Sequence, residues 1–366
     1  MQKRLHVLGL PWTQTTEDYL TCAYTQKVAK FTGMMMDEGY EVFLYSGEEN
    51  TARCTEHIPL ITEKKRRAWF GKNDQGDAFS RISWEPNDPW WRYFNTRAAG
   101  EVAARAEPHD FLCLTTSTQL AVADTQPDML PVEWAVGYEG VGPRWRIFES
   151  YAWMHHVYGR RFNGDGEAFD AVIPNFFDPA HFPVTQEKDD YLLFIGRVVS
   201  RKGPHVAAMI AERTGRKLLV AGPGVKHAEH GKIVAEELSI EGGDIEYVGP
   251  VGIEERARLM GGAAAVLVPT QYIEPFGGVA VEAMMCGTPV VTTDWGAFTE
   301  TVPEGVGGYR FRTLQEGAEA VEKAVRLHPH DVARYAHGRY TLGAVGPQFD
   351  RHFERLSTLW AEGWFA

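Results

Sequence analysis

The residues best suited to chemistry lie in one short stretch, Glu274-Pro-Phe-Gly277-Gly278-Val-Ala-Val-Glu282-Ala-Met-Met-Cys-Gly287. Gly277 and Gly278 stand where a strand-to-helix loop opens into an apolar helix, so a ligand can approach the backbone there. The free N–H groups and the dipole of a helix N-terminus favour an anion such as a diphosphate. The stretch therefore predicts a phosphate-binding loop with two nearby carboxylates.

Glu282 lies in the second turn of this predicted helix, among apolar neighbours. A carboxylate in such surroundings costs on the order of several kcal/mol unless it is hydrogen-bonded. The hydroxyls of a ribose would satisfy both of its oxygens, which favours a nucleotide as ligand. The alternatives are that Glu282 pairs with a nearby arginine and that Glu274 is a solvated loop acid.

A second group of polar residues follows the apolar run 191–195. It begins at Gly196-Arg197 and continues to Lys202-Gly203. Cations at the end of a strand can neutralise a diphosphate, most strongly when it leaves. We expect Arg197 and Lys202 to reach the same crevice as the first loop. An ordinary solvated basic loop is the alternative.

Apolar runs that alternate with segments of helical spacing must position these groups. This alternation predicts an α/β fold of two similar doubly wound domains that face each other, with ligands at the carboxyl ends of parallel strands. A helix is expected between residues 224 and 245, a less regular stretch from 50 to 95, and a surface cap at His109-Asp110. The other predicted elements are strands 5–10, 41–45, 111–115, 191–195, 217–221, 245–248, 264–268 and 289–293, and helices 19–38, 204–214, 277–285 and one from 254.

Composition limits the classes of protein. A chain of 366 residues favours two domains, and 44% hydrophobic with 23% charged residues is typical of soluble globular proteins. We find no apolar run of about 18 residues that could span a membrane. The four scattered cysteines predict a reduced, cytoplasmic protein without a zinc site, and the net charge of −12 disfavours a protein that coats nucleic acid.

Both polar stretches resemble the C-terminal half of the retaining glycosyltransferases of family GT4, which have the GT-B fold. The likeness is specific from about residue 191 to about residue 310. It rests on Gly-Arg…Lys-Gly at 196–203, Gly-Pro-Gly at 222–224, Tyr-Val-Gly at 247–249, Glu-x7-Glu at 274–282, Asp294-Trp-Gly296 and Glu300.

The resemblance implies three catalytic candidates, with Arg197 and Lys202 on the diphosphate and Glu274 on the sugar. Glu282 would hold the ribose, and the segment from Val248 to Val251 would frame the base. The complete nucleotide-sugar-binding set is Gly196, Gly222, Val248, Val251, Phe276, Gly277, Gly278 and Glu282.

The implied reaction is retaining transfer of a hexose-type sugar from a nucleotide diphosphate donor, with UDP the expected nucleotide, to an acceptor hydroxyl. The absence of any Asp-x-Asp agrees with a metal-independent reaction, and no cofactor is expected beyond the donor as co-substrate. The implied organisation is an acceptor-side domain over 1–183, a donor domain over 184–348, and a helix over 349–366 that packs back on the first domain.

The N-terminal half departs from the family. No glycine pair follows the first strand, and no histidine occurs in 132–140. We expect Trp12, Thr13 and Tyr138 on the acceptor side. The acceptor itself is open: a small molecule, a glycan, a lipid or DNA, with no stable membrane insertion.

Several other functions compete with this one. A sugar-nucleotide epimerase, a hydrolase or a donor-binding protein would share the donor residues, whereas a nicotinamide dehydrogenase is disfavoured because no GxGxxG follows the first strand. The stretch from Lys64 to Arg97 interleaves cations with aromatic residues, as a transferase acting on hydroxymethylated DNA bases would need. It could instead dock on anionic lipid or be a solvated loop with its tryptophans in the core. Its members are Lys64–Arg67, Trp69, Phe70, Arg81, Trp84, Trp90, Trp91, Arg92 and Arg97.

Overall fold

The chain forms two compact units in a computed structural model that describes residues 3–19, 22–71, 82–142, 145–161 and 164–362, with side chains to Leu359. Unit 1 contains residues 1–149, 157–176 and 345–366, and unit 2 contains residues 150–156 and 177–344. The chain passes from unit 1 to unit 2 at 176/177 and returns at 344/345. These points lie near the expected domain boundaries at 183/184 and 348/349.

Unit 1 is built on a sheet of seven parallel strands in the order β3-β2-β1-β4-β5-β6-β7. Most of its strand residues are buried, as in a parallel sheet covered on both faces. The strand order reverses between β1 and β4, which makes a topological switch point. The strands are β1 Arg4–Leu8, β2 Glu41–Gly47, β3 Glu56–Ile61, β4 Phe111–Leu114, β5 Leu130–Val136, β6 Arg146–Phe148 and β7 Ala171–Val172.

Helices cover both faces of this sheet. α3 and α4 pack on one face, while Phe31 of α1 stacks on Trp134 of the other face and contacts Phe349 of α12. Phe349 is 1% exposed, so α12 contributes to the core of unit 1. The helices are α1 Ala23–Asp37, α2 Glu63–Phe70, α3 Pro89–Ala103, α4 Leu120–Ala123, α5 Tyr151–Arg161 and α12 Leu342–Glu362, with short 3-10 turns at Glu17–Tyr19 and Ser117–Gln119. The first residues of α5 and of α12, up to 156 and 344, belong to unit 2.

The stretch from 50 to 95 is more regular than the sequence predicts, because it contains β3, α2 and the start of α3. Pro89 occupies the first turn of α3, where its missing N–H costs nothing. Trp91 and Phe94 then begin a buried stripe at helical spacing. The expectation of irregular structure was therefore wrong for β3, α2 and the start of α3, and the stripe of α3 continues past residue 95 to Ala98 and Val102.

Unit 2 is built on six parallel strands in the order β13-β9-β8-β14-β15-β16, with the strand order reversing between β8 and β14. α6 and α10 pack on one face of this sheet, and α7, α8 and α11 pack on the other. The strands are β8 Tyr191–Ile195, β9 Lys217–Ala221, β13 Ile245–Gly249, β14 Ala265–Val268, β15 Val290–Thr293 and β16 Gly308–Phe311. The helices are α6 Pro204–Thr214, α7 Ile253–Gly262, α8 Gly278–Met285, α9 Phe298–Thr301, α10 Leu314–Ala324 and α11 Pro329–Tyr340, with 3-10 turns at Pro179–His181 and Ser200–Lys202.

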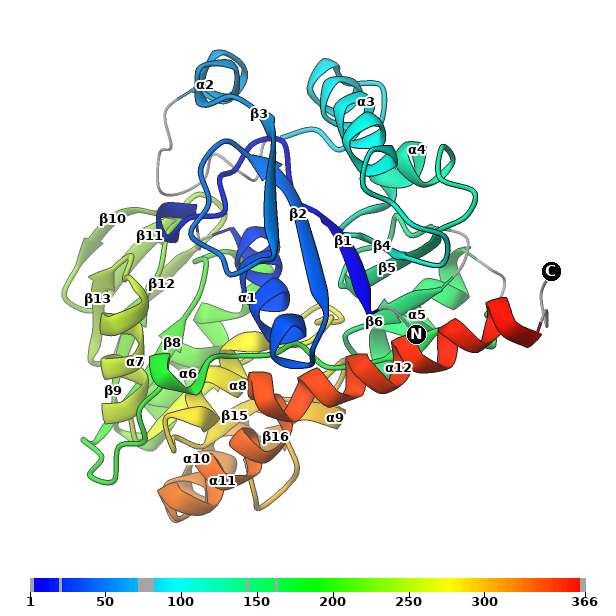
Figure 1. Ribbon diagram of the computed structural model, residues 1–366. Coiled ribbons are helices and arrows are strands. Elements are labelled where there is room, and N and C mark those ends of the chain that lie inside the picture. Colours follow the sequence, from blue (N-terminus) through cyan, green and yellow to red (C-terminus); the bar gives the residue numbers. More distant parts are fainter. Residues whose placement is uncertain (1–2, 20–21, 72–81, 143–144, 162–163, 363–366) are drawn as a thin grey trace. The chain divides into compact units, whose positions relative to one another are not determined.

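The helix expected between residues 224 and 245 is absent from the described chain, and three antiparallel strands occupy that stretch. They are β10 Val225–Glu229, β11 Lys232–Ala235 and β12 Ser239–Glu241, drawn beside β13 in Figure 1. Ile233, Ala235 and Ile240 are buried while their neighbours along the strands are more exposed, an alternation that fits strands rather than a helix. Glycines at 231 and at 242–243 form the bends that end β10 and β12.

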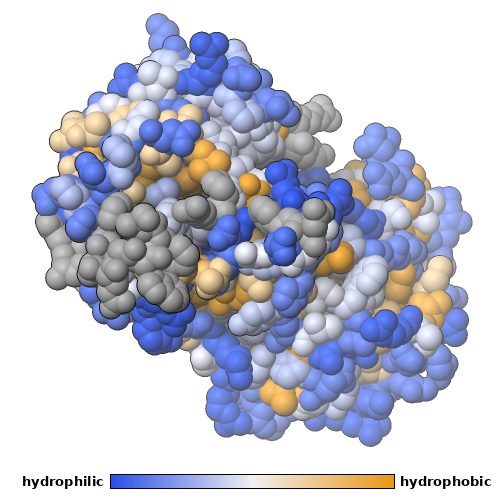
Figure 2. Space-filling view, turned by 90° about the vertical axis from the view of Figure 1, so that its right-hand side faces the viewer, coloured by the Kyte–Doolittle hydropathy of each residue, from blue (hydrophilic) through white to orange (hydrophobic). Residues whose placement is uncertain are grey.

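The surface in view in Figure 2 is mostly hydrophilic, with hydrophobic residues in several separate groups. Across the described residues, no helix combines the length and the apolar character that a membrane span requires.

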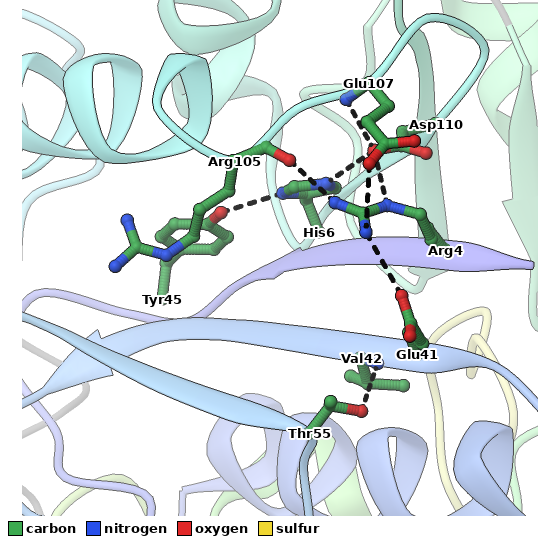
Figure 3. A network of polar contacts seen from close by, with 9 residues as sticks. All are labelled: Arg4, His6, Glu41, Val42, Tyr45, Thr55, Arg105, Glu107 and Asp110. Atoms are coloured by element: carbon green, nitrogen blue, oxygen red, sulfur yellow. Dashed lines mark hydrogen bonds and ion pairs between the residues drawn. The ribbon is translucent and has the colours of Figure 1, made fainter.

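A buried polar network joins β1, β2 and the residue before β4 near the amino ends of these strands (Figure 3). The Nε of Arg4 donates to Asp110 Oδ2 over 3.1 Å, and His6 Nε2 lies 3.0 Å from the same oxygen. His6 Nδ1 lies 2.8 Å from the hydroxyl of Tyr45. Asp110 is 2% exposed, so the expectation of a surface cap was wrong for this residue: its carboxylate turns inward to two basic side chains.

The pKa of Asp110 reflects two opposing effects. Burial raises it, while hydrogen bonds from His6, the backbone N–H of Glu107 and Arg4 lower it, and the lowering prevails. The carboxylate is therefore stabilised in its charged form and ties together strands whose opposite ends carry the loops of unit 1.

We expect Asp110→Asn to lower the free energy of unfolding by about 1–3 kcal/mol, because an amide cannot replace the buried carboxylate that accepts charge-assisted hydrogen bonds from Arg4 and His6, although Glu41 still pairs with Arg4. Urea denaturation followed by tryptophan fluorescence measures this loss. The matched control is Asp124→Asn, which changes an exposed side chain of the same unit and should shift the midpoint very little. Equal shifts in the two variants would contradict a structural role for the network.

Candidate functional site

The candidate site lies in unit 2, in the loops that follow β8 and β14 on either side of the switch point. The two loops touch through their backbones. Gly203 has φ +76°, and a Cβ there would lie 2.1 Å from the carbonyl oxygen of Pro269. The backbone N–H of Gln271 donates to the carbonyl of Arg201 over 2.8 Å. Only glycine permits this approach, which brings the side chains of both loops together.

The first consequence is an ion pair between two of the predicted catalytic residues. Lys202 Nζ lies 2.7 Å from Glu274 Oε2, and the hydroxyl of Tyr272 donates to the same oxygen over 2.8 Å. The side chains of Lys202 and Glu274 are 28% and 13% exposed. Glu274 is therefore not a freely solvated loop acid. Arg197 is exposed at the carboxyl end of β8, after Gly196.

The N-terminus of α8 lies at the end of the second loop. Gly277 caps the helix with φ +80°, and a Cβ there would lie 2.4 Å from the ring of Phe298, while Gly278 is the first helical residue. The first N–H groups of a helix have no intrahelical partners, so they can donate hydrogen bonds to a ligand. Phe276 is 3% exposed and stacks on Phe177, so its ring belongs to the core of unit 2.

Glu282 does pair with an arginine, the alternative that the sequence left open. Its Oε2 lies 2.5 Å from an NH2 nitrogen of Arg256 on α7, and the side chains of Glu282 and Arg256 are 10% and 31% exposed. Within the described residues, Glu282 Oε2 makes no hydrogen bond, and neither does Arg256 Nε. The charge of Glu282 is balanced, but its hydrogen-bonding capacity is not used up.

The loop after β15 supports the one that carries Glu274. The backbone N–H of Ala297 donates to the carbonyl of Glu274 over 3.1 Å, and the indole N–H of Trp295 donates to the carbonyl of Thr270 over 3.1 Å. Glu300 accepts the backbone N–H groups of Tyr151 and Ala152, so it caps the start of α5.

The remaining predicted donor residues lie at the carboxyl ends of β9 and β13. The hydroxyl of Tyr247 donates to the carbonyl of Gly222 over 2.8 Å, which joins the two strand ends. Val248 and Val251 are partly buried and pack on the core. The sequence did not identify Arg256 or Tyr272, because their roles come from tertiary contacts. In the part of the chain that the structure describes, no three His, Cys, Asp or Glu side chains are grouped as a metal would require.

The three predicted acceptor-side residues belong to unit 1. Trp12 is 2% exposed and packs edge-on against Trp84, and Thr13 is 2% exposed with its hydroxyl 2.7 Å from that of Thr25. The half-buried Tyr138 donates to Glu133 Oε1 over 2.5 Å. Of the three, Tyr138 has the most accessible side chain, and their roles stay predictions.

Glu133 is 2% exposed and also accepts the backbone N–H of Gly142 over 2.5 Å. Burial raises the pKa of Glu133 to about 7, against the lowering effect of the hydrogen bonds from Tyr138 and Gly142. This carboxyl group therefore changes charge near neutral pH.

Most of the C-terminal half matches a known protein family. Residues 179–337 match the family model described as glycosyl transferases group 1. A D-inositol 3-phosphate glycosyltransferase of Nocardiopsis dassonvillei is 36% identical over 197 residues, 48% of this chain and 44% of the relative. An uncharacterized glycosyltransferase of Methanocaldococcus jannaschii is 29% identical over 175 residues, 47% of this chain and 39% of the relative. The matched stretch thus spans less than half the length of these relatives.

Two solved structures resemble almost the whole chain. AviGT4, a glycosyltransferase involved in avilamycin A biosynthesis, matches with a TM-score of 0.69 at 21% identity over 97% of this chain and 98% of its own. HepE of Anabaena in complex with UDP-glucose matches with a TM-score of 0.61 at 15% identity over 97% and 100%. The fold is that of the GT-B glycosyltransferases. The predicted resemblance to this class is confirmed, and the family model places it in the C-terminal half.

We expect Gly277→Ala to lower the melting temperature and to weaken binding of a nucleotide diphosphate, because the new Cβ would collide with Phe298 at a strained φ and displace the start of α8. Calorimetric titration with UDP and a thermal melt measure the two effects. Gly338→Ala is the control, since Gly338 is an exposed position of α11 and no atom lies within 4 Å of its Cβ position, so it should not lower stability. Unchanged UDP affinity in a folded Gly277→Ala protein would show that the N-terminus of α8 does not bind UDP.

The raised pKa of Glu133 predicts a pH dependence of stability. The folded protein binds more protons than the unfolded chain between the ordinary value of 4.5 and about 7, so this contribution is lost as pH rises through that range. Relative to Glu133→Gln, the wild type should lose up to about 3 kcal/mol between these limits. Urea denaturation at a series of pH values measures the difference, and parallel curves would contradict it.

Proposed function

We propose that this protein is a glycosyltransferase, as the match of its C-terminal half to that family indicates, and that it takes a hexose-type sugar from a nucleotide diphosphate donor. The observation that carries the proposal is the meeting of the Lys202–Glu274 ion pair with the N-terminus of α8 at one sheet edge of unit 2. A cation, a helix dipole and a carboxylate are what a diphosphate joined to a sugar requires.

In this proposal each group has a separate task. Arg197, Lys202 and the backbone at Gly277 bind the diphosphate, and Glu274 accepts hydroxyl groups of the sugar. Glu282 accepts the ribose hydroxyls with the hydrogen-bonding capacity that its ion pair with Arg256 leaves unused. Val248 and Val251 supply apolar contact for the base.

The chemistry follows from charge that develops as the diphosphate leaves. Arg197 and Lys202 stabilise that charge, and no protein nucleophile is needed if the enzyme aligns the acceptor hydroxyl with the anomeric carbon. The departing oxygen then accepts the acceptor's proton. Retention of configuration and independence from metal ions stay predictions that rest on the family resemblance, and so does a cytoplasmic location.

A UDP-sugar is the proposed donor. The complexes of HepE with UDP-glucose and with UDP support this choice, because HepE shares the fold of this chain. The name of the Nocardiopsis relative indicates a phosphorylated polyol acceptor for that protein. The acceptor of this chain is proposed only as a hydroxyl compound.

DNA and lipid acceptors receive less support from the stretch between Lys64 and Arg97. Arg66 is 2% exposed and pairs with Glu63, and Trp91 is completely buried. These residues contribute to the interior of unit 1, as the alternative with the tryptophans in the core predicts. Arg81 lies outside the described residues.

We expect one nucleotide among UDP-, GDP-, ADP- and TDP-sugars to raise the melting temperature in the presence of EDTA. A ligand at about a hundredfold over its Kd adds about 2.7 kcal/mol. In Glu282→Gln this shift should be strongly reduced relative to the variant's own ligand-free melt, because an amide cannot accept from both ribose hydroxyls.

Glu254→Gln is the matched control, since Glu254 is exposed on α7, and it should keep the full shift. No shift in the wild type with any nucleotide would overturn the proposal. Mass spectrometry of a reaction with candidate acceptors then separates a transferase from an epimerase, which forms no conjugate, and from a donor-binding protein, which forms no product.

A further inference from the structure

An open depression of about 500 Å³ in unit 2 adjoins the loops of the candidate site. Its size is in the range of small-molecule sites. The residues that line it are Arg197, Val199, Ser200, Arg201, Glu237 and Gln271. Arg197 has a task in the proposed donor site, whereas Arg201, Glu237 and Gln271 have none.

The depression presents two guanidinium groups without carboxylate partners. Arg197 and Arg201 are exposed, and no carboxylate of the described residues lies within 4.0 Å of either. Arg256 and Arg310 of the same unit, in contrast, lie 2.5 Å and 2.9 Å from carboxylate oxygens. Two guanidinium groups without carboxylate partners in a hollow are suited to a phosphate or carboxylate ligand.

Arg201 is held in place from two sides. Its guanidinium carbon lies 5.1 Å from the ring centre of Tyr272, and its carbonyl accepts the backbone N–H of Gln271. The side-chain nitrogen of Gln271 in turn lies 3.1 Å from His205 Nε2. Tyr272 also donates to Glu274, so one aromatic ring separates Arg201 from the carboxylate proposed to hold the sugar.

Glu237 gives the depression a second chemical character. It lies in the turn between β11 and β12, within the three strands that occupy the place of the expected helix. Its side chain is exposed. A carboxylate in the same lining repels a simple anion, but it accepts hydrogen bonds from hydroxyl groups. The lining therefore matches a ligand that carries an anionic group and hydroxyl groups together.

We propose that this depression is a subsite for a polyhydroxylated anion, a sugar phosphate or a sugar acid. Arg201 binds its anionic group beside Arg197, which holds the diphosphate, and Glu237 with Gln271 binds its hydroxyl groups. This inference deepens the proposed function and rests on it, because the ligand is the part of the substrate next to the sugar at Glu274. The anionic group belongs either to the acceptor or to the transferred sugar.

Calorimetric titrations distinguish these two sources. Glucose 6-phosphate and glucose are titrated into wild type with and without UDP, and UDP-glucuronate is compared with UDP-glucose. Glucose 6-phosphate that binds the UDP-loaded protein better than glucose indicates an anionic acceptor. Tighter binding of UDP-glucuronate than of UDP-glucose indicates an anionic sugar on the donor.

Arg201→Gln should weaken the preferred anionic ligand about tenfold, as expected for one lost charge-assisted hydrogen bond, and leave the affinity for UDP unchanged. Glu237→Gln should weaken glucose 6-phosphate or UDP-glucuronate but not inorganic phosphate. Arg213→Gln, at an exposed arginine of α6 outside the depression, is the matched control and should change none of these affinities.

Three results would overturn the subsite: no preference of the wild type for either anion over its neutral counterpart, a preference unchanged in Arg201→Gln, or an equal loss of UDP affinity in that variant. The last would assign Arg201 to the diphosphate. Failure of the proposed function is a different result, in which no nucleotide binds the wild type. The titrations of nucleotide-free protein with glucose 6-phosphate then still decide whether the depression binds hydroxylated anions.

Discussion

The contact between Gly203 and the carbonyl of Pro269 is the constraint on which the candidate site depends. It holds the loop after β8 against the loop after β14 at a distance that no side chain at position 203 would allow. Lys202, the neighbouring residue, is consequently close enough to Glu274 to form an ion pair with it. The polar groups are thus ordered before a ligand arrives, and electrostatic stabilisation of a leaving group is most effective from such a preorganised arrangement.

Charge is distributed unevenly around this contact. Glu274 balances Lys202, and Arg256 balances Glu282, so the two predicted carboxylates both belong to ion pairs. Arg197 and Arg201 have no such partner among the described side chains. The net positive charge that an anionic substrate encounters therefore comes from the two arginines and the start of α8, whereas the paired residues supply geometry and hydrogen bonds more than net charge.

The sequence predicts the local parts of this arrangement well. β8 and α6 have the predicted bounds, because an apolar run ends at a glycine and a proline begins the helix. Two kinds of feature escape prediction. The strands from 225 to 241 depend on pairing with each other and on packing beneath α6, which short apolar segments do not reveal. The partner of Glu282 lies on a separate helix, so no spacing in the sequence identifies Arg256.

Helix α12 begins in unit 2 and contributes Phe349 and Phe353 to the interior of unit 1. A ribosome makes the rest of unit 1 first, then all of 177–344, and only afterwards the part of this helix that belongs to unit 1. Unit 2 can therefore complete its core while unit 1 still exposes the apolar surface around Phe31 and Phe111. The later-made unit is the first that can complete its core, and exposed apolar surface of the kind left on the earlier-made one makes partly folded chains prone to aggregation in general.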